Sequence, residues 1–393
     1  MESFNLENIC RAAADAKKGI GCLNTNEKNE ALLSVADALV KNEAVIIEAN
    51  MKDMENGRQN GMKSAILDRL FLNGDRIEAM AKGLRKVAGL PDPIGEVMDM
   101  SKRPNGMTVG KRRVPIGVIG IIYEARPNVT STRAIVNIIR KALESCNIDA
   151  NAVTLIESAD RSVTKEFMKM NKYVDLLIPR GSAGLIRATM ENSTIPVIET
   201  GTGNCHVYVD KDADINMALN ILVNAKTQRI GVCNACESLV IHRNIIGEFL
   251  PKAVSALKEH NVEIRGDKEA RDISGEIVSA TDEDFYTEYL DYIISVRTVG
   301  SVEEAIDHIN EHNTKHSETI ITENYETACK FLDEIDAACV YVNASTRFTD
   351  GEEFGFGAEI GISTQKLHAR GPMGLRELTT YKYVIYGNGQ IRN

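Results

Sequence analysis

The segment VPIGVIGIIY, residues 114–123, marks a change in the pattern of the chain: helical periodicity precedes it, and the segment itself is a run of β-branched residues. Similar runs follow, separated by segments with helical periodicity; the runs are 152–156, 174–178 and 195–198, and the helical segments are 134–143 and 185–190. Strands that alternate with helices are typical of βαβ units, in which the strands pair in parallel. The sequence therefore predicts an α/β fold built on a parallel sheet.

The same alternation restarts in the second half of the chain. The expected helices are 215–223, 246–258, 302–308 and 325–335, and the expected strands are 237–242, 292–296 and 338–342, with a strand-like tail at 381–386. At 393 residues the chain is longer than one hydrophobic core usually organises. We therefore expect a second α/β domain.

Composition narrows the class of protein. Hydrophobic residues make up 43% and charged residues 26%, which is typical of a soluble globular protein. The net charge of -10 argues against a nucleic-acid-binding protein, because such binding depends on clustered Lys and Arg. No signal-peptide pattern and no run of about 18 apolar residues is present, so we expect a cytoplasmic protein without a membrane span. The eight scattered cysteines agree with a reducing compartment.

One cysteine has the surroundings of a nucleophile. Cys233 lies in KTQRIGVCNACESLVIH, residues 226–242, where Lys226 and Arg229 supply positive charge that could stabilise a thiolate. Asn234, the next residue, could steady a developing oxyanion. The alternative is that Cys233 is a buried packing residue, as many free cysteines are.

Two other cysteines compete with Cys233 for this role. Cys236 forms a C-x-x-C pair with Cys233, but it leads directly into a hydrophobic strand, which favours core packing, and Cys205 lies in a glycine-rich segment. A four-ligand metal site would need distant partners. The evenly spaced His308, His312 and His316 lack neighbouring carboxylate or cysteine ligands, so we predict no metal site.

Two glycine-rich turns follow predicted strands. IPRGSAGLI, residues 178–186, passes from a strand into a helix, an arrangement whose backbone N–H groups can bind a phosphate; the alternative is an ordinary tight turn. PVIETGTGNCH, residues 196–206, offers Glu199 as a general base beside a glycine-rich backbone; here the alternative is a turn with an exposed carboxylate.

Seven stretches, in order along almost the whole chain, give it a resemblance to a known family. They are LPDPIGEV (90–97), RVPIGVIGIIYEARPNVT (113–130), IPRGSAGLI (178–186), PVIETGTGNCHVYVD (196–210), NAKTQRIGVCNA (224–235), AIDHINEHNTKHSE (305–318) and ARGPMGLRELTTYKY (369–383). In these segments the chain resembles the gamma-glutamyl phosphate reductase family, the proline-biosynthesis branch of the aldehyde dehydrogenase superfamily.

The resemblance implies an aldehyde-dehydrogenase-like α/β fold. A Rossmann-type cofactor domain would span residues 1–225, and a catalytic domain would span 226–365. Residues 366–393 would return to the cofactor domain and supply an oligomerisation strand, with residues 100–114 contributing to the same small extension. The protein would assemble as a homo-oligomer.

The resemblance also implies the reaction, which is the NADPH-dependent reduction of L-glutamyl 5-phosphate to L-glutamate 5-semialdehyde and phosphate. Cys233 falls on the family's nucleophile and would carry the substrate as a thioester. Asn128 or Asn234, with the Cys233 backbone amide, would stabilise the oxyanion, and Glu199 would have a supporting role.

Binding residues are assigned in the same way. For NADPH, the resemblance points to Glu124, Arg126, Pro127, Arg180, Gly181, Ser182, Gly201 and Glu352. The substrate carries a carboxylate and a phosphate, so a basic pocket is expected within this acidic protein. Lys226, Arg229 and Arg347 are the expected substrate-binding cations.

The chain departs from the family pattern after Thr130. There YEARPNVT passes directly to STRAIVNIIRKALE, so that roughly one strand and one helix of the cofactor domain, about two dozen residues by the length of a βαβ unit, are missing. The missing stretch includes the lysine and the loop expected at the adenosine end of NADPH. Cofactor binding is therefore expected to be impaired.

Two other functions compete with the reductase. One is an oxidising aldehyde dehydrogenase, which would hydrolyse the thioester instead of forming it from an acyl phosphate. The other is a non-catalytic subunit that binds glutamate kinase, the enzyme that supplies the acyl phosphate. Activity without phosphate would favour the first, and partner binding without NADPH affinity would favour the second.

Overall fold

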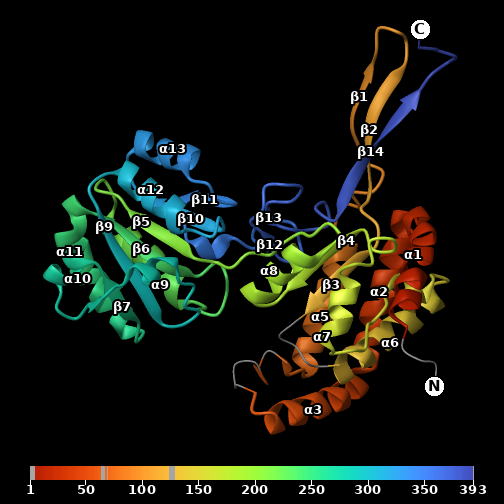
Figure 1. Ribbon diagram of the computed structural model, residues 1–393, viewed down its shortest axis with the longest axis horizontal. Coiled ribbons are helices and arrows are strands. Elements are labelled where there is room, and N and C mark those ends of the chain that lie inside the picture. Colours follow the sequence, from red (N-terminus) through yellow and green to blue (C-terminus); the bar gives the residue numbers. More distant parts are fainter. Residues whose placement is uncertain (1–4, 63–66, 69, 124–128, 393) are drawn as a thin grey trace. The chain divides into compact units, whose positions relative to one another are not determined.

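The computed structural model describes residues 5–62, 67–68, 70–123 and 129–392 (Figure 1). The chain divides into two compact units. The first comprises Met1–Glu199, Phe356–Ala358 and Gly374–Asn393, and the second comprises Thr200–Gly355 and Glu359–Met373.

The second unit is built on a seven-stranded sheet in which every pair of neighbours is parallel. Its strands are β5 (Cys205–Val209), β6 (Cys236–His242), β7 (Glu263–Gly266), β8 (Val278–Ser279), β9 (Ile293–Val299), β10 (Ser317–Ile321) and β11 (Cys339–Val342). Their order in the sheet is β11-β10-β5-β6-β9-β7-β8. The central strands β5, β6 and β10 are buried along their whole length, which is expected of a parallel sheet covered on both faces.

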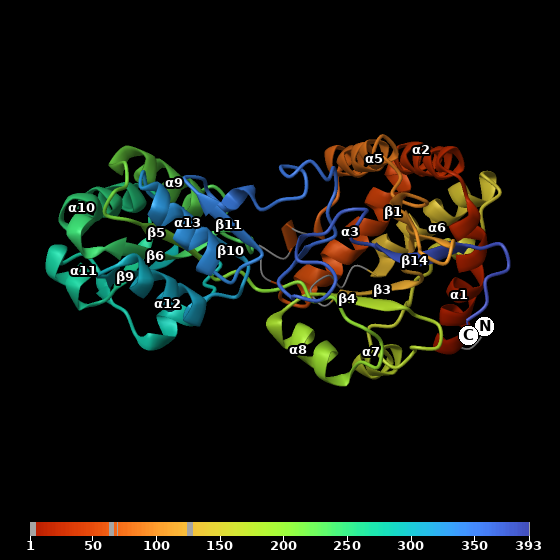
Figure 2. The ribbon, with the colours of Figure 1, turned by 90° about the horizontal axis from the view of Figure 1, so that it is seen from above.

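Helices cover both faces of this sheet (Figures 1 and 2). They are α9 (Ile215–Thr227), α10 (Arg243–Glu259), α11 (Lys268–Ile273), α12 (Val302–His312) and α13 (Tyr325–Glu334). Side chains alternate along each strand: Val207 and Leu239 pack with α9, α10 and α11, whereas Tyr208 and Val240 pack with α12 and α13. The sheet therefore lies between two hydrophobic cores.

The first unit is mainly helical. Its helices are α1 (Leu6–Cys22), α2 (Thr25–Lys41), α3 (Glu43–Gln59), α5 (Gly74–Ala88), α6 (Val129–Ser145), α7 (Arg161–Phe167) and α8 (Ala183–Asn192). Ile46, Ile77 and Ile138 belong to the core shared by α2, α3, α5 and α6. The buried Asp53 carboxylate accepts the Ser131 N–H at 2.7 Å and so satisfies a backbone donor at the start of α6.

Two small sheets complete the first unit. β3 (Ile119–Tyr123) pairs in parallel with β4 (Leu176–Arg180). β1 (Val97–Lys102), β2 (Thr108–Pro115) and β14 (Thr379–Tyr386) form an antiparallel sheet that extends away from the helices of this unit in Figure 1. The tail predicted as a strand at 381–386 is therefore β14.

The run at 114–123 differs from its prediction, because it is divided between two sheets. Its first residues end β2 and its last five form β3. Gly117, between them, has φ +134°, and a Cβ there would collide with the Asp175 carboxylate. The same carboxylate accepts the Val118 N–H at 2.7 Å. Glycine at this bend therefore allows the chain to leave one sheet and enter the other.

Two further strand predictions were wrong in whole or in part. Residues 152–156 form no strand: the 3₁₀ turn Ala150–Ala152 is followed by irregular backbone. Within the described ranges β3 pairs with β4 alone, so this β-branched run has no neighbouring strand to join. Residues 195–198 contribute only a parallel bridge between Leu177 and Val197.

The division between the units also differs from the expected boundary at 225/226. Residues 200–225 lie in the second unit because β5 pairs with β6 and β10 on either side. Of the tail 366–393, only Gly374–Asn393 belongs to the first unit. No helix in the described parts of the chain combines the length and apolar character needed to cross a bilayer.

Candidate active site

Cys233 lies at the amino-terminal edge of the sheet in the second unit. It precedes β6 by three residues, and the segments before the neighbouring strands meet at the same edge because all the strands are parallel. These segments contain Gly203 and Asn204 before β5, His316 before β10, and Glu288 before β9. The side chains around Cys233 therefore come from segments far apart in sequence.

The backbone of Cys233 is in close contact with the segment before β5. The Cys205 Sγ is 3.2 Å from the Cys233 carbonyl oxygen, to which it donates a hydrogen bond. Gly203 packs directly against the same carbonyl, and a Cβ at this position would overlap the Cys233 backbone. Only glycine fits at Gly203 without movement of the Cys233 backbone.

Several hydrogen bonds hold this segment in place. The Gly203 N–H donates to Glu288 Oε1 at 2.7 Å. The Asn204 N–H donates to Thr314 Oγ1 at 3.0 Å, and the Asn204 side-chain amide donates to the carbonyls of Phe285 (2.7 Å) and His312 (2.9 Å). Burial raises the pKa of Glu288, and the Gly203 N–H opposes that rise. The surface against which Cys233 rests is thus fixed by side chains from the β9 and β10 regions.

The Asn234 side chain is engaged inside the protein. Its amide nitrogen lies 2.8 Å from the Thr349 carbonyl and 3.3 Å from the Arg347 carbonyl, and the Thr346 hydroxyl donates to the Asn234 carbonyl at 2.8 Å. With both amide hydrogens directed to backbone carbonyls, this side chain is not available to an oxyanion. The expectation for Asn234 is therefore corrected to a structural role.

Two arginines supply positive charge near Cys233. Arg229 is exposed, and Arg347 is half-buried with its Nε 2.8 Å from Gln228 Oε1. Desolvation, and then repulsion by the Arg229 guanidinium, lowers the pKa of Arg347, whereas the charge of a Cys233 thiolate raises it. The Arg347 guanidinium therefore interacts electrostatically with both the Arg229 guanidinium and the Cys233 sulfur, and nearby positive charge favours a thiolate.

Lys226 has a different position from the one expected. It is 0% exposed, and its Nζ forms an ion pair with Glu237 Oε2 at 2.5 Å. Burial raises the pKa of Glu237 to about 7, and Lys226 opposes that rise. Because a lysine enclosed with its own counterion cannot reach a ligand, we correct the substrate-binding expectation for Lys226 to a buried structural pair.

The three candidate nucleophiles differ in exposure. Burial raises the pKa of Cys236 to about 12 and that of Cys205 well above its ordinary range, so both remain protonated thiols. Both are 0% exposed, whereas Cys233 is half-buried. Of the three, only Cys233 is accessible to a substrate.

Three histidines of this unit, His206, His308 and His312, lie close together. His308 and His312 end α12, and burial lowers the pKa of His308 to about 2, so it is neutral at physiological pH. The His206 Nδ1 lies 2.9 Å from Glu318 Oε2, and both side chains are fully buried. Among the residues that the structure describes, no three His, Cys, Asp or Glu side chains are arranged to hold a metal ion. The sequence suggested no role for His206 or Glu318, because their pairing depends on which strands the fold places side by side.

The turn expected to bind a phosphate is present in the first unit. β4 ends at Arg180 and α8 begins at Ala183. Ser182 is the N-cap, and its hydroxyl accepts the Leu185 N–H at 3.3 Å. Gly181 and Ser182 are exposed, so the backbone N–H groups at the start of α8 can be reached from solvent.

The remaining predicted residues are distributed over both units. Glu199, half-buried, ends the first unit, and Gly201 and the exposed Glu352 lie in the second. The structure does not bring Gly201 or Glu352 to the Arg180–Ser182 turn within one unit. Four predicted residues lie outside the described ranges; they are Glu124, Arg126, Pro127 and Asn128.

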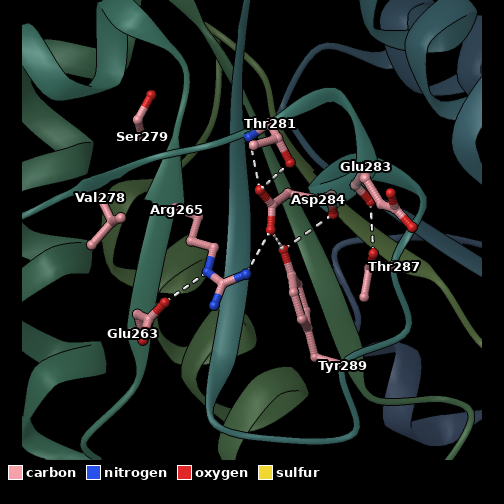
Figure 3. A pocket seen from close by; sticks show the side chains of 9 residues that line it. All are labelled: Glu263, Arg265, Val278, Ser279, Thr281, Glu283, Asp284, Thr287 and Tyr289. Carbon is pink, nitrogen blue, oxygen red and sulfur yellow. Dashed lines mark hydrogen bonds and ion pairs between the residues drawn. The ribbon is translucent and has the colours of Figure 1, made fainter.

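A separate pocket of about 440 Å³ lies at the β7–β8 side of the second unit (Figure 3). Arg265 pairs there with Glu263 (Nε to Oε1, 2.6 Å) and Asp284 (Nη1 to Oδ1, 2.8 Å), and the Tyr289 hydroxyl donates to Asp284 at 2.8 Å. Arg265 and the two carboxylates thus pair with one another, and none of the predicted site residues lines this pocket.

Comparisons with known proteins identify the family of the chain. A model of the aldehyde dehydrogenase family matches residues 127–292 and 276–384. A gamma-glutamyl phosphate reductase from Lachnospira eligens is 58% identical over 416 aligned positions, which cover 100% of this chain and 100% of that protein. A protein of the same name from Dictyoglomus thermophilum is 54% identical, with 98% of this chain and 100% of that protein covered.

Solved structures give the same result. The gamma-glutamyl phosphate reductase of Thermotoga maritima matches with a TM-score of 0.96 at 48% identity, covering 99% of this chain and 100% of that one. An acetylating aldehyde dehydrogenase from Geobacillus thermoglucosidasius, 16% identical, shares the fold with a TM-score of 0.67 over 99% of this chain and 97% of its own. The predicted resemblance and the aldehyde-dehydrogenase-like α/β fold are confirmed. The chain belongs to the aldehyde dehydrogenase family and, within it, to the gamma-glutamyl phosphate reductases.

Proposed function

We propose that this chain is an oxidoreductase that reduces L-glutamyl 5-phosphate to L-glutamate 5-semialdehyde and phosphate, a step of proline biosynthesis, with Cys233 as the nucleophile. The relatives at 58% and 54% identity are named for this reductase activity. The observation that carries the residue assignment is the contrast among the cysteines. Cys233 is half-buried beside two arginines, whereas Cys205 and Cys236 are enclosed thiols.

The chemistry begins with attack of the Cys233 thiolate on the acyl carbon of the substrate. A bond forms between sulfur and carbon, the bond from carbon to the phosphate oxygen breaks, and phosphate leaves with the bonding electrons. The resulting thioester divides one difficult reduction into two easier steps. Backbone N–H groups at Cys233 are suited to stabilise the tetrahedral oxyanion, and Asn128 stays a predicted contributor.

A nicotinamide cofactor, NADPH in this proposal, would supply the hydride that reduces the thioester to the aldehyde. Arg180, Gly181 and Ser182 would hold its phosphate groups, since they form a strand–turn–helix with an exposed glycine and an N-cap serine. The expected contributions of Glu124, Arg126, Pro127, Gly201 and Glu352 are retained as part of the same proposal.

Arg229 and Arg347 are the proposed substrate-binding cations. Both are cations close to the site, and a cation there attracts a Cys233 thiolate and an incoming phosphate alike. Arg229 is exposed and can therefore reach a ligand. Glu199 has a supporting role in this proposal, because a general base that activates water would hydrolyse the thioester and defeat reduction.

We further propose that the chain lacks one strand and one helix after Thr130. The alignment with the Lachnospira eligens protein has 416 positions, whereas this chain has 393 residues, so that relative contains residues without a counterpart here. The failure of residues 152–156 to form a strand supports the same interpretation. A groove of about 690 Å³ along α2, α3 and α6 opens beside the start of α6, where the missing helix would be connected. Weakened NADPH binding follows from this loss.

The proposal includes a cytoplasmic homo-oligomer. In the sheet β1-β2-β14, exposed apolar side chains such as Met98, Met100, Tyr383 and Ile385 support its expected use as an oligomerisation extension. Association with glutamate kinase is retained as a partner proposal.

The reaction can be tested in reverse by supplying L-glutamate 5-semialdehyde, phosphate and NADP⁺ and following the appearance of NADPH. The expected result is phosphate-dependent turnover that Cys233→Ser reduces by at least about a thousandfold, since the thiolate is the nucleophile. A Cys236→Ser variant is the matched control. Normal turnover of Cys233→Ser would reject the assignment, and phosphate-independent oxidation would favour the oxidising alternative. Measuring NADPH binding separately distinguishes a loss of cofactor affinity from a loss of nucleophile.

A further inference from the structure

We propose that Cys205 is a positioning residue for Cys233, because its buried thiol holds the carbonyl of the peptide that joins Cys233 to Asn234. This inference deepens the proposed function and rests on it, because it assigns a role in the reaction of Cys233. Cys205 itself does not contact the substrate. It acts through the backbone of the nucleophile.

The geometry places Cys205 on one side of that peptide. Cys205 begins β5 and is paired in the sheet with Cys236, the first residue of β6. Its Sγ is 3.2 Å from the Cys233 oxygen, and Gly203 packs against the same carbonyl. The carbonyl is therefore held from the side of β5 by a hydrogen bond and by direct backbone contact.

A chain of side chains continues from Cys205 toward Asn234. The Cys205 Sγ lies 3.7 Å from His316 Nδ1, and His316 Nδ1 lies 2.8 Å from Ser317 Oγ. The Ser317 and Thr349 hydroxyls are 2.6 Å apart. The Thr349 carbonyl accepts the Asn234 side-chain amide at 2.8 Å, which closes a ring around the Cys233–Asn234 peptide.

The ring fixes the orientation of a planar unit. Because the peptide bond is planar and trans, holding the Cys233 oxygen also sets the direction of the Asn234 N–H and restricts rotation about the Cys233 Cα–C bond. Acyl transfer depends on the alignment of the sulfur with the acyl carbon, and a displacement of about 1 Å can slow such a step by about a hundredfold. Cys205 is therefore expected to affect the rate of acyl transfer and to have little effect on binding.

Cys205 is suited to this role because it remains protonated. It is 0% exposed, and burial raises its pKa well above the ordinary range, so the thiol keeps its hydrogen as a donor. Cys236 is an equally buried cysteine on the adjacent strand, but its thiol donates to the Ser238 carbonyl at 3.3 Å. Cys236 is thus a matched control that lacks the contact with Cys233.

The test measures acylation of Cys233 by acetyl phosphate in the full chain, with the site of modification located by peptide mass mapping. This assay needs no cofactor, so a loss of NADPH binding does not affect it. For Cys205→Ala we expect the maximal acylation rate to fall about tenfold, with the half-saturating acetyl phosphate concentration changed less than about twofold. Cys205→Ser keeps a donor and should recover most of the rate, and Cys236→Ala should match the unchanged protein.

Thermal unfolding of the two alanine variants provides the check on folding, because each loses one buried thiol. The inference is overturned if Cys205→Ala and Cys236→Ala have equal acylation rates, if Cys205→Ser is no better than Cys205→Ala, or if only the half-saturating concentration changes. Failure of the proposed function is distinct: the unchanged protein would not be acylated at Cys233, or Cys233→Ser would keep full turnover.

Discussion

The two proposed binding regions use opposite ends of parallel strands. In the first unit, the Arg180–Ser182 turn follows the carboxyl end of β4 and begins α8. In the second unit, Cys233 precedes the amino end of β6, after α9 has ended at Thr227. The carboxyl edge is the usual ligand edge of an open α/β sheet, because helices begin there and their N–H groups attract anions.

The amino-terminal edge has the opposite electrostatics. α9 ends at Thr227, shortly before Cys233 in the chain, and the partial negative charge of a helix C-terminus disfavours a nearby thiolate. Arg229 and Arg347 offset this charge. If both proposals hold, the carboxyl edge binds an anion mainly through backbone N–H groups at a helix start, whereas the amino-terminal edge depends on cationic side chains.

The largest effect that would distinguish the two regions comes from adding a methyl group to a glycine. We expect Gly203→Ala to lower acylation of Cys233 by more than about a hundredfold and to cost about 3 kcal/mol of unfolding free energy, because the new Cβ overlaps the Cys233 backbone. Gly184→Ala, in the first turn of α8, meets only Ser182 Oγ at 3.6 Å and should be neutral or slightly stabilising. Acylation assays and urea unfolding would measure both, and similar behaviour of the two variants would contradict the comparison.

A smaller effect is expected from removing positive charge at the amino-terminal edge. Arg347→Met should move the midpoint of Cys233 alkylation by iodoacetamide to higher pH by about one unit, because the guanidinium and the thiolate stabilise each other. Arg243→Met removes an exposed arginine that pairs with Glu269 in the same unit and serves as the control. An unchanged midpoint in Arg347→Met would mean that another group stabilises the thiolate.

The smallest predicted effect is on the pH dependence of stability, and it comes from a histidine that packs beside the amino-terminal edge. The His308 ring packs 5.3 Å from the Phe285 ring, and the Phe285 carbonyl accepts the Asn204 amide. The pKa of His308 is about 2 in the fold, against an ordinary value of 6.5, because burial disfavours its charge. The unfolded chain therefore takes up a proton below pH 6.5 that the folded protein does not, and stability decreases as the pH falls through this window.

His308→Phe should remove this contribution. We expect its unfolding free energy to be flatter between pH 6.5 and 4, by at most about 1.4 kcal/mol per pH unit. His260→Gln changes an exposed histidine at the end of α10 and should leave the slope as it is. Urea unfolding at several pH values provides the measurement, and parallel curves for His308→Phe and the unchanged protein would contradict it.

The sequence was sufficient for the elements with a clear period. The helical segments and the strands near 174–178, 237–242 and 338–342 were predicted within a few residues, because β-branched runs and amphipathic patterns are local signals. β5 and β10 were not anticipated. Their sequences, CHVYV and SETII, place His206 and Glu318 inside a sheet buried on both faces, where the two side chains pair with each other although they are distant in sequence.

The site residues also differ in whether local sequence or only the fold reveals their role. Cys233 could be proposed as a candidate from its neighbours, since a free cysteine among cations is a local pattern, and the family resemblance favoured it over the other two. The burial of Lys226 against Glu237 and the engagement of Asn234 with Thr349 could not, because both depend on which residues the fold brings together. The segment 114–123 was assigned to one strand because only the approach of Asp175 reveals the bend at Gly117.

The pairing of β14 with β2 has a consequence for biosynthesis. Thr379–Tyr386 pairs with Thr108–Pro115, so the three-stranded sheet joins segments separated by more than 250 residues, and the second unit is encoded between them. A ribosome makes the chain from the N-terminus, and domains generally fold as units during synthesis. The three-stranded sheet therefore cannot be completed until translation has nearly finished, whereas most of the second unit has emerged by then and can fold earlier.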